Sequence, residues 1–152
     1  MKRTLTIAKS ALITSLESAD VSFVPPIARR RLSPLQKIFF ALAHATGATE
    51  GAVVFASRDG EDTLTRRLVD DFHADGSVSP NRFSSSVYNA APGLWSIRSA
   101  NTAPYTAIAG GDETVECGLL ESLGASPLLY VVAEETLGGR GAAVLFSDSS
   151  VG

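Results

Sequence analysis

Residues 106–118 read TAIAGGDETVECG. The short apolar run Tyr105–Ala109 meets two glycines, then a group of acidic residues, then Cys117, the only cysteine of the chain. This order is typical of a strand that turns sharply into the start of a helix. Enzymes often place a nucleophile on such a turn, because the start of a helix stabilises negative charge. The stretch therefore indicates an α/β fold with a turn of the kind that can carry an active site.

The residue types on this turn argue against catalysis there. Asp112 and Glu113 follow Gly110 and Gly111 directly, and their charge would repel a bound phosphate. We expect Asp112 to cap the helix instead, since acids suit its N-terminal end. Cys117 lies more than a helical turn further on among acidic neighbours, which disfavour a thiolate. The residue types therefore indicate a turn that has the geometry of an active site but lacks a nucleophile.

No other group of residues has the spacing of a catalytic or metal site. His44 and His73 each fall near the predicted end of a helix, and neither pairs with Cys117 in a known motif. The run Ser84–Ser86 lacks the spacing of a nucleophile elbow. We therefore expect neither a cofactor nor a bound metal.

Composition points to one domain that covers residues 1–152. Hydrophobic residues make up 45% of the 152 residues and charged residues 19%, which is enough apolar material for a real core. The net charge of −3 argues against general nucleic-acid binding. A single cysteine fits a reducing compartment, and no apolar run reaches the ~20 residues of a membrane span. We expect a cytoplasmic protein. The one dense basic spot, Arg29–Arg31, is either a solvated approach to a helix or a dock for an acidic partner.

Strands and helices alternate along the chain. The predicted strands are 5–13 (weak), 51–57, 105–109, 128–134 and 141–146, and the predicted helices start at Ser33-Pro34, at Asp62, at Ser79-Pro80 and at Glu113. Alternation implies a largely parallel sheet. The six residues Glu135–Arg140 are long enough only for a hairpin, so we expect an antiparallel last strand and a five-stranded mixed sheet.

Apolar spacing and prolines set the expected faces and ends of the helices. Gly47 should end the first helix. In the second helix we expect Leu64, Leu68 and Phe72 to point inward. Ser79-Pro80 should start a third helical segment, Ser84–Ala91, which Pro92-Gly93 interrupts.

Two stretches, FSSSVYNAAPGLWSI (83–97) and APYTAIAGGDETVECGLL (103–120), resemble the ketosynthase branch of the thiolase superfamily. The residues in register with that branch are Asn89, Gly93, Ser96, Ile97 and Pro104. Pro92 stands where the family has Ala, and Ala103 where it has Gly. Continuing the register places Asp112 at the position of the nucleophilic cysteine.

The segments PPIARRRLSPLQKI (25–38) and GAVVFASRDGE (51–61) are similar to a narrower group. These are short ketosynthase-like, or chain-length-factor-like, proteins found with aryl polyene and related type II fatty-acid pathways. A complete ketosynthase has two similar halves, and its second half supplies two histidines. The resemblance implies half of a thiolase-like fold that lacks both the nucleophile and the histidines, and hence no condensation by this chain alone.

The helix predicted over Glu113–Leu123 offers a check on this implication. At about 100° per residue, Val115, Leu119 and Leu123 share one face, and acidic residues spread over the opposite arc. We expect the apolar face to be buried and the polar face exposed, as a half-fold without a second sheet requires.

The resemblance implies a non-catalytic subunit that pairs with an active β-ketoacyl-ACP synthase and helps shape its acyl tunnel. The expected interface and tunnel residues are Phe83, Ser86, Val87, Asn89, Tyr105 and Ala107. Two alternatives remain: a stand-alone acyl-thioester enzyme that uses Cys117 or Asp112, and an acyl-carrier-protein-binding module docked through Arg29, Arg30 and Arg31. The isolated chain could also form a homodimer through the same partner surface.

Overall fold

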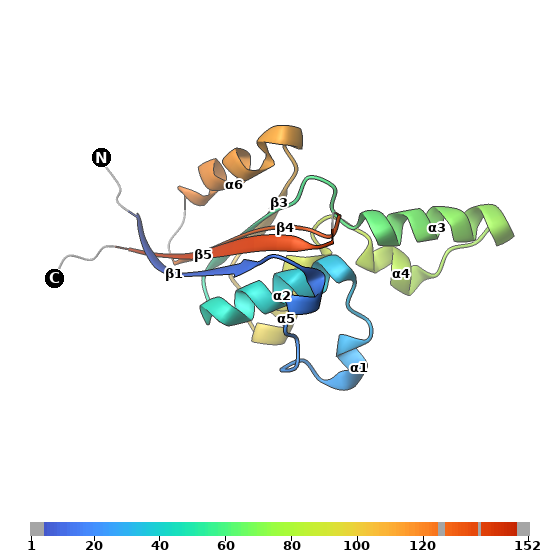
Figure 1. Cartoon of the computed structure of the whole chain (residues 1–152), viewed down its shortest axis with the longest axis horizontal. Coiled ribbons are helices and arrows are strands. Elements are labelled where there is room, and N and C mark those ends of the chain that lie inside the picture. Colours follow the sequence, from blue (N-terminus) through green and yellow to red (C-terminus); the bar gives the residue numbers. More distant parts are fainter. Residues whose placement is uncertain (1–4, 125–126, 137, 149–152) are drawn as a thin grey trace.

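A computed structural model describes residues 5–124, 127–136 and 138–148 (Figure 1). The strands are β1 (Leu5–Ile13), β2 (Ala52–Ala56), β3 (Tyr105–Ile108), β4 (Leu128–Glu134) and β5 (Arg140–Asp148). The α-helices are α1 (Pro26–Arg29), α2 (Pro34–Thr46), α3 (Asp62–Asp75), α4 (Pro80–Ser85), α5 (Ala90–Ser99) and α6 (Thr114–Ser122), with short 3-10 turns at Leu16–Ser18 and Gly111–Glu113. No helix in the described part of the chain is long and apolar enough to cross a membrane.

The strands form one sheet in the order β1-β5-β4-β2-β3. β2 pairs in parallel with both β3 and β4, whereas β5 pairs antiparallel with β4 and with β1. The five-stranded mixed sheet and its antiparallel β5 are therefore confirmed. The order leaves β3 and β1 as the two edge strands, and both carry backbone groups that face away from the sheet.

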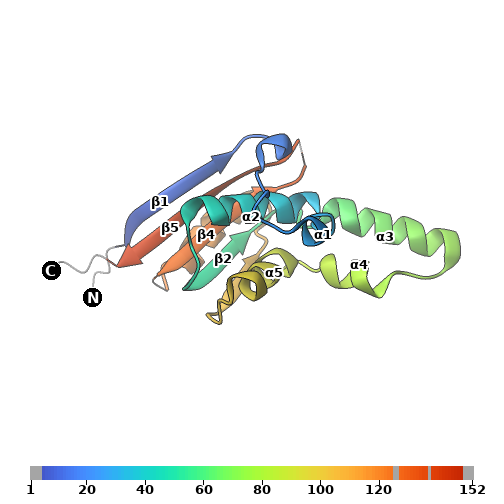
Figure 2. The same ribbon diagram turned by 90° about the horizontal axis from the view of Figure 1, so that it is seen from below.

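The main core lies between the sheet and α2, with α5 beside α2 on the same face (Figure 2). Ser33 starts α2 with a full capping box: its hydroxyl accepts from the Gln36 N–H, and the Gln36 side chain accepts from the Ser33 N–H. Gly47 ends the helix at φ 70°, as its position predicts. The largest fully buried side chains of this core include Phe39 and Phe55, whose rings pack edge to face.

The opposite face of the sheet carries α6 (Figure 1). Its buried residues are Thr114, Gly118 and Ser122, one small residue per turn. A Cβ at Gly118 would lie 2.6 Å from the Tyr130 ring, so glycine there lets the helix sit directly on the sheet. The Tyr130 hydroxyl donates to the Val115 carbonyl at 2.9 Å, and burial raises the pKa of that hydroxyl to about 12.

This contact corrects the expected face of α6. The predicted buried residues Val115, Leu119 and Leu123 are all exposed, because the helix packs through its small residues and not through its large ones. The expectation that only a polar arc of this helix meets solvent is therefore wrong.

The helices α3 and α4 form an arm that projects from the end of the sheet (Figures 1 and 2). We call residues Asp62–Ser85 the arm. An ion pair between Arg82 and Asp71, at 2.7 Å, joins its two helices. Leu68 is the only buried residue of α3, and Phe72, expected to point inward, is 55% exposed. Phe72 lies beyond the reach of the core because the arm leaves the domain.

Ser79 and Pro80 start a helix, as the sequence predicts, and the Ser79 hydroxyl accepts from the Arg82 N–H. The extent of the helix expected over Ser84–Ala91 is corrected. α4 ends at Ser85, and a separate α5 begins at Ala90 with Pro92 inside its first turn. A proline is tolerated there because the first N–H groups of a helix have no partner within it. Pro92 therefore belongs to the start of a helix and not, as the sequence pattern predicts, to the end of one.

Candidate functional site

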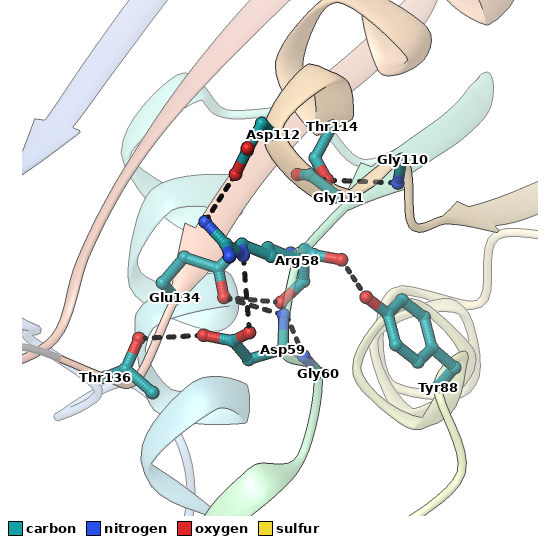
Figure 3. Close-up of polar contacts among 11 residues, drawn as sticks. Arg58, Asp59, Gly60, Tyr88, Gly110, Gly111, Asp112, Thr114, Glu134 and Thr136 are labelled. Carbon is teal, nitrogen blue, oxygen red and sulfur yellow. Dashed lines mark hydrogen bonds and ion pairs between the residues drawn. The ribbon is translucent and has the colours of Figure 1, made fainter.

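The glycine turn joins the end of β3 to the start of α6, as the sequence predicts, but Asp112 does not cap the helix. The N-cap residue is Glu113, and no side chain caps α6. The hydroxyl of Thr114, the first residue of α6, instead holds the turn: it accepts from the Gly110 N–H at 3.0 Å and donates to the Gly111 carbonyl at 2.7 Å (Figure 3). Gly111 adopts φ +58°, a left-handed conformation that favours glycine. The predicted cap at Asp112 is wrong because the 3-10 turn at Gly111–Glu113 carries its side chain outward.

Asp112 instead binds Arg58, from the loop that follows β2. The Arg58 Nη1 and Asp112 Oδ1 atoms lie 2.7 Å apart, and the Asp112 side chain is 87% exposed (Figure 3). The residue that the register places at the nucleophile position is thus an ion-paired carboxylate at the surface. The ends of two neighbouring parallel strands bring these residues together.

Glu134, which the sequence pattern does not single out, fixes the Arg58 loop from the end of β4. Its carboxylate accepts from the Ser57 hydroxyl at 3.0 Å, from the Asp59 N–H at 3.2 Å, and from the Arg58 N–H. The hydroxyl of Tyr88 donates to the Ser57 carbonyl from the opposite side (Figure 3). Burial, and then the charge of Glu134, raise the pKa of Tyr88. In the sequence, the only sign of this role of Glu134 is that it is an acidic residue at the end of a predicted buried strand.

Cys117 lies under the glycine turn. A Cβ built at Gly110 would come within 2.9 Å of the Cys117 Sγ, so the thiol packs closely against the backbone there. His44 is on the other face of the sheet, at the end of α2, with its ring stacked on Phe23 at 3.8 Å. His73 is in the arm. The structure does not bring the three residues together, and its described part contains no group of three or more potential metal ligands.

The arginine triplet divides between two roles. Arg29 donates from Nη2 to the carbonyls of Ser22 and Val24, at 3.0 and 2.9 Å, and so holds the loop before α1. Arg30 and Arg31 are exposed and line a groove beside α1. The expected basic dock therefore loses one member to a structural role and keeps two.

The expected interface residues lie on the arm, on the segment that follows it, and on β3. Phe83 is 59% exposed on α4, and Val87 is exposed just beyond it. The Ser86 hydroxyl donates to the Phe83 carbonyl at 2.8 Å, and Asn89 is exposed where α5 begins. Further exposed apolar side chains of the arm are Val69, Phe72 and Val78.

The backbone N–H and C=O groups on the open edge of β3 are those of Tyr105 and Ala107. The carbonyls of Pro104 and Ile108 accept from the N–H groups of Val53 and Ser57, on the β2 side. Backbone groups alternate along a strand, so those of Tyr105 and Ala107 point away from β2. The side chain of Ala107 packs into the main core, while Tyr105 is exposed beside α5.

A buried carboxylate lies where the arm meets the domain. Glu61, immediately before α3, is 3% exposed and accepts from the Gln36 Nε2 atom at 2.8 Å. The same nitrogen donates to the Ser85 carbonyl at 3.2 Å, at the end of α4. Burial raises the pKa of Glu61 to about 7. Gln36 thus links α2 to both ends of the arm.

A mixed sheet with α2 and α5 on one face, α6 on the other, and a glycine turn from an edge strand into α6 defines half of a thiolase-like fold. Residues 6–139 match the family described as "Beta-ketoacyl synthase, N-terminal domain". The chain belongs to this family and is a ketosynthase-like protein of the thiolase superfamily.

A solved structure described as "Ketosynthase (ApeO) in Complex with its Chain Length Factor (ApeC) from Xenorhabdus doucetiae" contains a chain with the same fold. That chain aligns with a TM-score of 0.83 at 20% sequence identity, over 97% of this chain and 80% of its own length. Among curated proteins, none matches the sequence.

Proposed function

We propose that this chain is a non-catalytic, chain-length-factor-like subunit that pairs with an active β-ketoacyl-ACP synthase and helps shape its acyl tunnel. The observation that carries the proposal is the open edge of β3 at Tyr105 and Ala107, together with the exposed apolar side chain of Phe83 on α4. In the ketosynthases that the chain resembles, the matching helix and strand form the dimer interface. The similar solved structure is itself described as a ketosynthase in complex with its chain length factor.

Two physical features support a role in pairing. An edge strand with free N–H and C=O groups can extend a sheet across two chains. Apolar side chains such as Phe72 and Phe83 are exposed on an arm that packs little against its own domain. Because these side chains are already almost half buried, their complete burial by a partner would stabilise a complex by on the order of 1 kcal/mol each.

The turn before α6 supports a non-catalytic role. At the register position of the nucleophile stands Asp112, whose charge is balanced by Arg58 at 2.7 Å. A carboxylate held in this way is a weaker nucleophile than a thiolate. Cys117, the one thiol, packs beneath Gly110 and is displaced from that position by five residues (117 − 112).

The effect on chain length would come from α4 and from the segment that joins α4 to α5. By resemblance, Phe83, Ser86 and Val87 face the tunnel of the partner ketosynthase. A bulky Phe83 would then fill space that a longer acyl chain needs. The aryl polyene-type pathway remains a prediction from resemblance, as does a carrier-protein dock at the arginine triplet.

Co-expression with an active ketosynthase from the same pathway tests the proposal. We expect a one-to-one complex by size-exclusion chromatography with light scattering. Products should lengthen with Phe83→Ala and shorten with Phe83→Trp. Absence of a complex, or products of unchanged length and yield in both variants, would contradict it.

The alternative of an independent acyl-thioester enzyme has its own test. The purified chain is incubated with acyl thioesters, and its intact mass is measured. An acyl adduct that disappears in Cys117→Ala or Asp112→Ala would favour the enzyme, whereas an unmodified mass supports the non-catalytic role.

A further inference from the structure

Two carboxylates are buried at the root of the arm, which is the place where its two ends meet Gln36 of α2. Glu61 directly precedes α3, and Glu135 belongs to the connection from β4 to β5. Within the described part of the chain, the Oε2 atom of each carboxylate is buried without a hydrogen-bond partner. An unpartnered buried carboxylate oxygen costs free energy, so a folded chain rarely keeps two of them without a role.

The first turn of α3 is capped from outside the helix. Glu61 is the N-cap residue, but its side chain makes no hydrogen bond to the start of the helix. The Thr63 N–H donates instead to the Oε1 atom of Glu135 at 2.5 Å. Glu135 therefore satisfies the start of α3 from the domain, and the Glu61 side chain is free to turn toward α2.

The arm is held to α2 by one buried amide. The Nε2 atom of Gln36 donates to the Glu61 carboxylate at 2.8 Å and to the Ser85 carbonyl at 3.2 Å. Gln36 is fully buried, and its Oε1 atom accepts from the Ser33 N–H. Beyond its root the arm projects from the domain (Figure 2), so these contacts position both of its helices.

The charged neighbours of Glu61 in the chain are bound elsewhere. Asp59 accepts from the Thr136 hydroxyl at 3.2 Å, and Asp62 pairs with Arg66 at 2.7 Å. Among the residues that the structure describes, no lysine, arginine or histidine lies within ion-pair distance of Glu61. A negative charge on Glu61 is therefore not balanced by a cation.

The groups that act on Glu61 come from two elements. Burial raises its pKa to about 7, and the negative charge of Glu135 adds to the rise. Hydrogen bonds from Ser33 and Gln36 of α2 oppose it but do not cancel it. Near neutral pH this site is thus close to the point at which the carboxyl gains or loses its proton.

We propose that Glu61 is a proton-dependent lock that positions the arm. A protonated Glu61 is neutral, accepts from Gln36 and keeps the arm on α2. Loss of the proton leaves a negative charge buried beside Glu135, and opening of the root into water relieves it. Glu61 and Gln36 are positioning residues, because they act on a partner only through the arm that carries Phe83. Only this effect on a partner rests on the proposed function.

The direction of the pH dependence follows from linkage. In an open arm Glu61 meets water and has its ordinary pKa of 4.5, whereas the docked arm holds the proton up to about pH 7. Docking is therefore favoured most below pH 4.5 and weakens as the pH rises through 7. These two pKa values limit the change in the docking equilibrium to about thirtyfold between pH 5.5 and 8.

Hydrogen exchange at the Thr63 amide measures opening of the root, because its acceptor, Glu135, belongs to the domain. By NMR, its protection, corrected for intrinsic exchange, should fall at least ~tenfold from pH 5.5 to 8. Low urea should leave it unchanged, since opening exposes little surface, but should reduce the protection of Val131, which is buried in β4. If Thr63 follows Val131 in urea, the arm opens only with the whole chain and the proposal is overturned.

Two matched variants separate the titration of Glu61 from other effects of pH. Glu61→Gln keeps an acceptor for Gln36 but cannot ionise, so Thr63 protection should no longer change with pH. Asp70→Asn removes an exposed carboxylate of the arm and should follow the parent chain. A parent-like pH dependence in Glu61→Gln, or its loss in Asp70→Asn, would overturn the lock. Protection that millimolar MgCl₂ or CaCl₂ restores at pH 8 would replace the lock by a cation site.

The consequence for pairing is measured on the complete chain with a purified active ketosynthase. From pH 5.5 to 8, the affinity of the parent chain should fall at least ~fivefold more than that of Glu61→Gln, because only the parent loses the docked arm. The same fall in both would overturn the link to pairing. A chain that pairs at neither pH contradicts the proposed function alone, since exchange at Thr63 still decides whether the lock exists.

Discussion

The guanidinium of Arg58 and the carboxylate of Asp112 lie 2.7 Å apart, across the turn that leads into α6. Arg58 is itself positioned by Glu134, which accepts from the backbone of the same loop. The ends of β2, β3 and β4 therefore meet at one charged cluster. In this cluster Asp112 forms an ion pair with Arg58, at the position where the family resemblance would place a nucleophile.

A thiol introduced at residue 112 should be reactive. Asp112→Cys in a Cys117→Ala background places a sulfur on an exposed turn beside Arg58, and a neighbouring cation lowers a thiol pKa. We expect iodoacetamide to alkylate this introduced thiol at least ~tenfold faster at pH 7 than it alkylates Cys117 of the parent chain. Intact mass follows the alkylation.

The control for this experiment adds Arg58→Ala to the same double variant, and the introduced thiol should then react more slowly, because the neighbouring cation is gone. Equal alkylation rates for the introduced thiol and for Cys117 of the parent chain would contradict the described turn.

Gly118, on the face of α6 that packs on the sheet, should not tolerate a side chain. Gly118→Ala puts a Cβ 2.6–2.9 Å from Tyr130 and Ala56, and we expect the free energy of unfolding to fall by about 1–3 kcal/mol. Chemical denaturation measures the loss. Gly124→Ala, where the new Cβ would lie 3.6 Å from the nearest atom, should change stability far less. Equal effects of the two substitutions would show that α6 does not sit this close to the sheet.

The buried Glu61 should make stability depend on pH in an unusual direction. Burial raises its pKa from 4.5 to about 7, so near neutral pH the folded chain holds a proton that the unfolded chain releases. Its contribution is therefore fully present below about pH 4.5 and is lost as the pH rises through 7.

We expect Glu61→Gln to gain on the order of 2 kcal/mol over the parent chain between pH 5 and 8, with the gain growing as the pH rises. Urea unfolding across that range measures the difference. Glu50→Gln, at an exposed position, is the control and should follow the parent curve. A gain of Glu61→Gln that does not change with pH would contradict the assigned titration.

Pairing with a ketosynthase through the open edge of β3 should depend on the N–H group of Ala107. Ala107→Pro removes an N–H that points away from β2, whereas Ala107→Ser keeps it. We expect the proline variant to lose affinity for a ketosynthase by about five- to tenfold, because a lost hydrogen bond at a strand interface costs about 1–1.5 kcal/mol. Biolayer interferometry on the purified partners measures this. Retention of full affinity would place the interface elsewhere.

The sequence predicts the sheet well and the faces of the helices poorly. Runs such as Leu128–Glu134 are strand-length and apolar, and the short link to β5 admits only a hairpin, so topology follows from local signals. α6 shows the limit. Its apolar stripe predicts one face, yet Gly118 and its small neighbours decide the packing, since distance to the sheet depends on Tyr130, far away in sequence.

The site shows a similar division. The turn and the position of Asp112 in it are predicted from the local sequence. Arg58 and Glu134 lie near this turn only because β2 pairs with β3 and with β4. The run Arg29–Arg31 indicates part of the groove beside α1. Folding turns Arg29 inward to the loop before α1 and brings Arg67 from another helix, which no local pattern could indicate.

In the proposed function, Phe83 connects pairing with a ketosynthase to the length of the acyl product, so it offers the sharpest test of that proposal. The quantities to measure are the molar mass of the co-expressed complex by light scattering and the length of its product, for the parent chain, Phe83→Ala and Phe83→Trp. We expect a one-to-one complex in all three, with longer products from Phe83→Ala and shorter products from Phe83→Trp. A chain that stays alone, or a complex whose product length ignores residue 83, would show that this chain is not such a subunit.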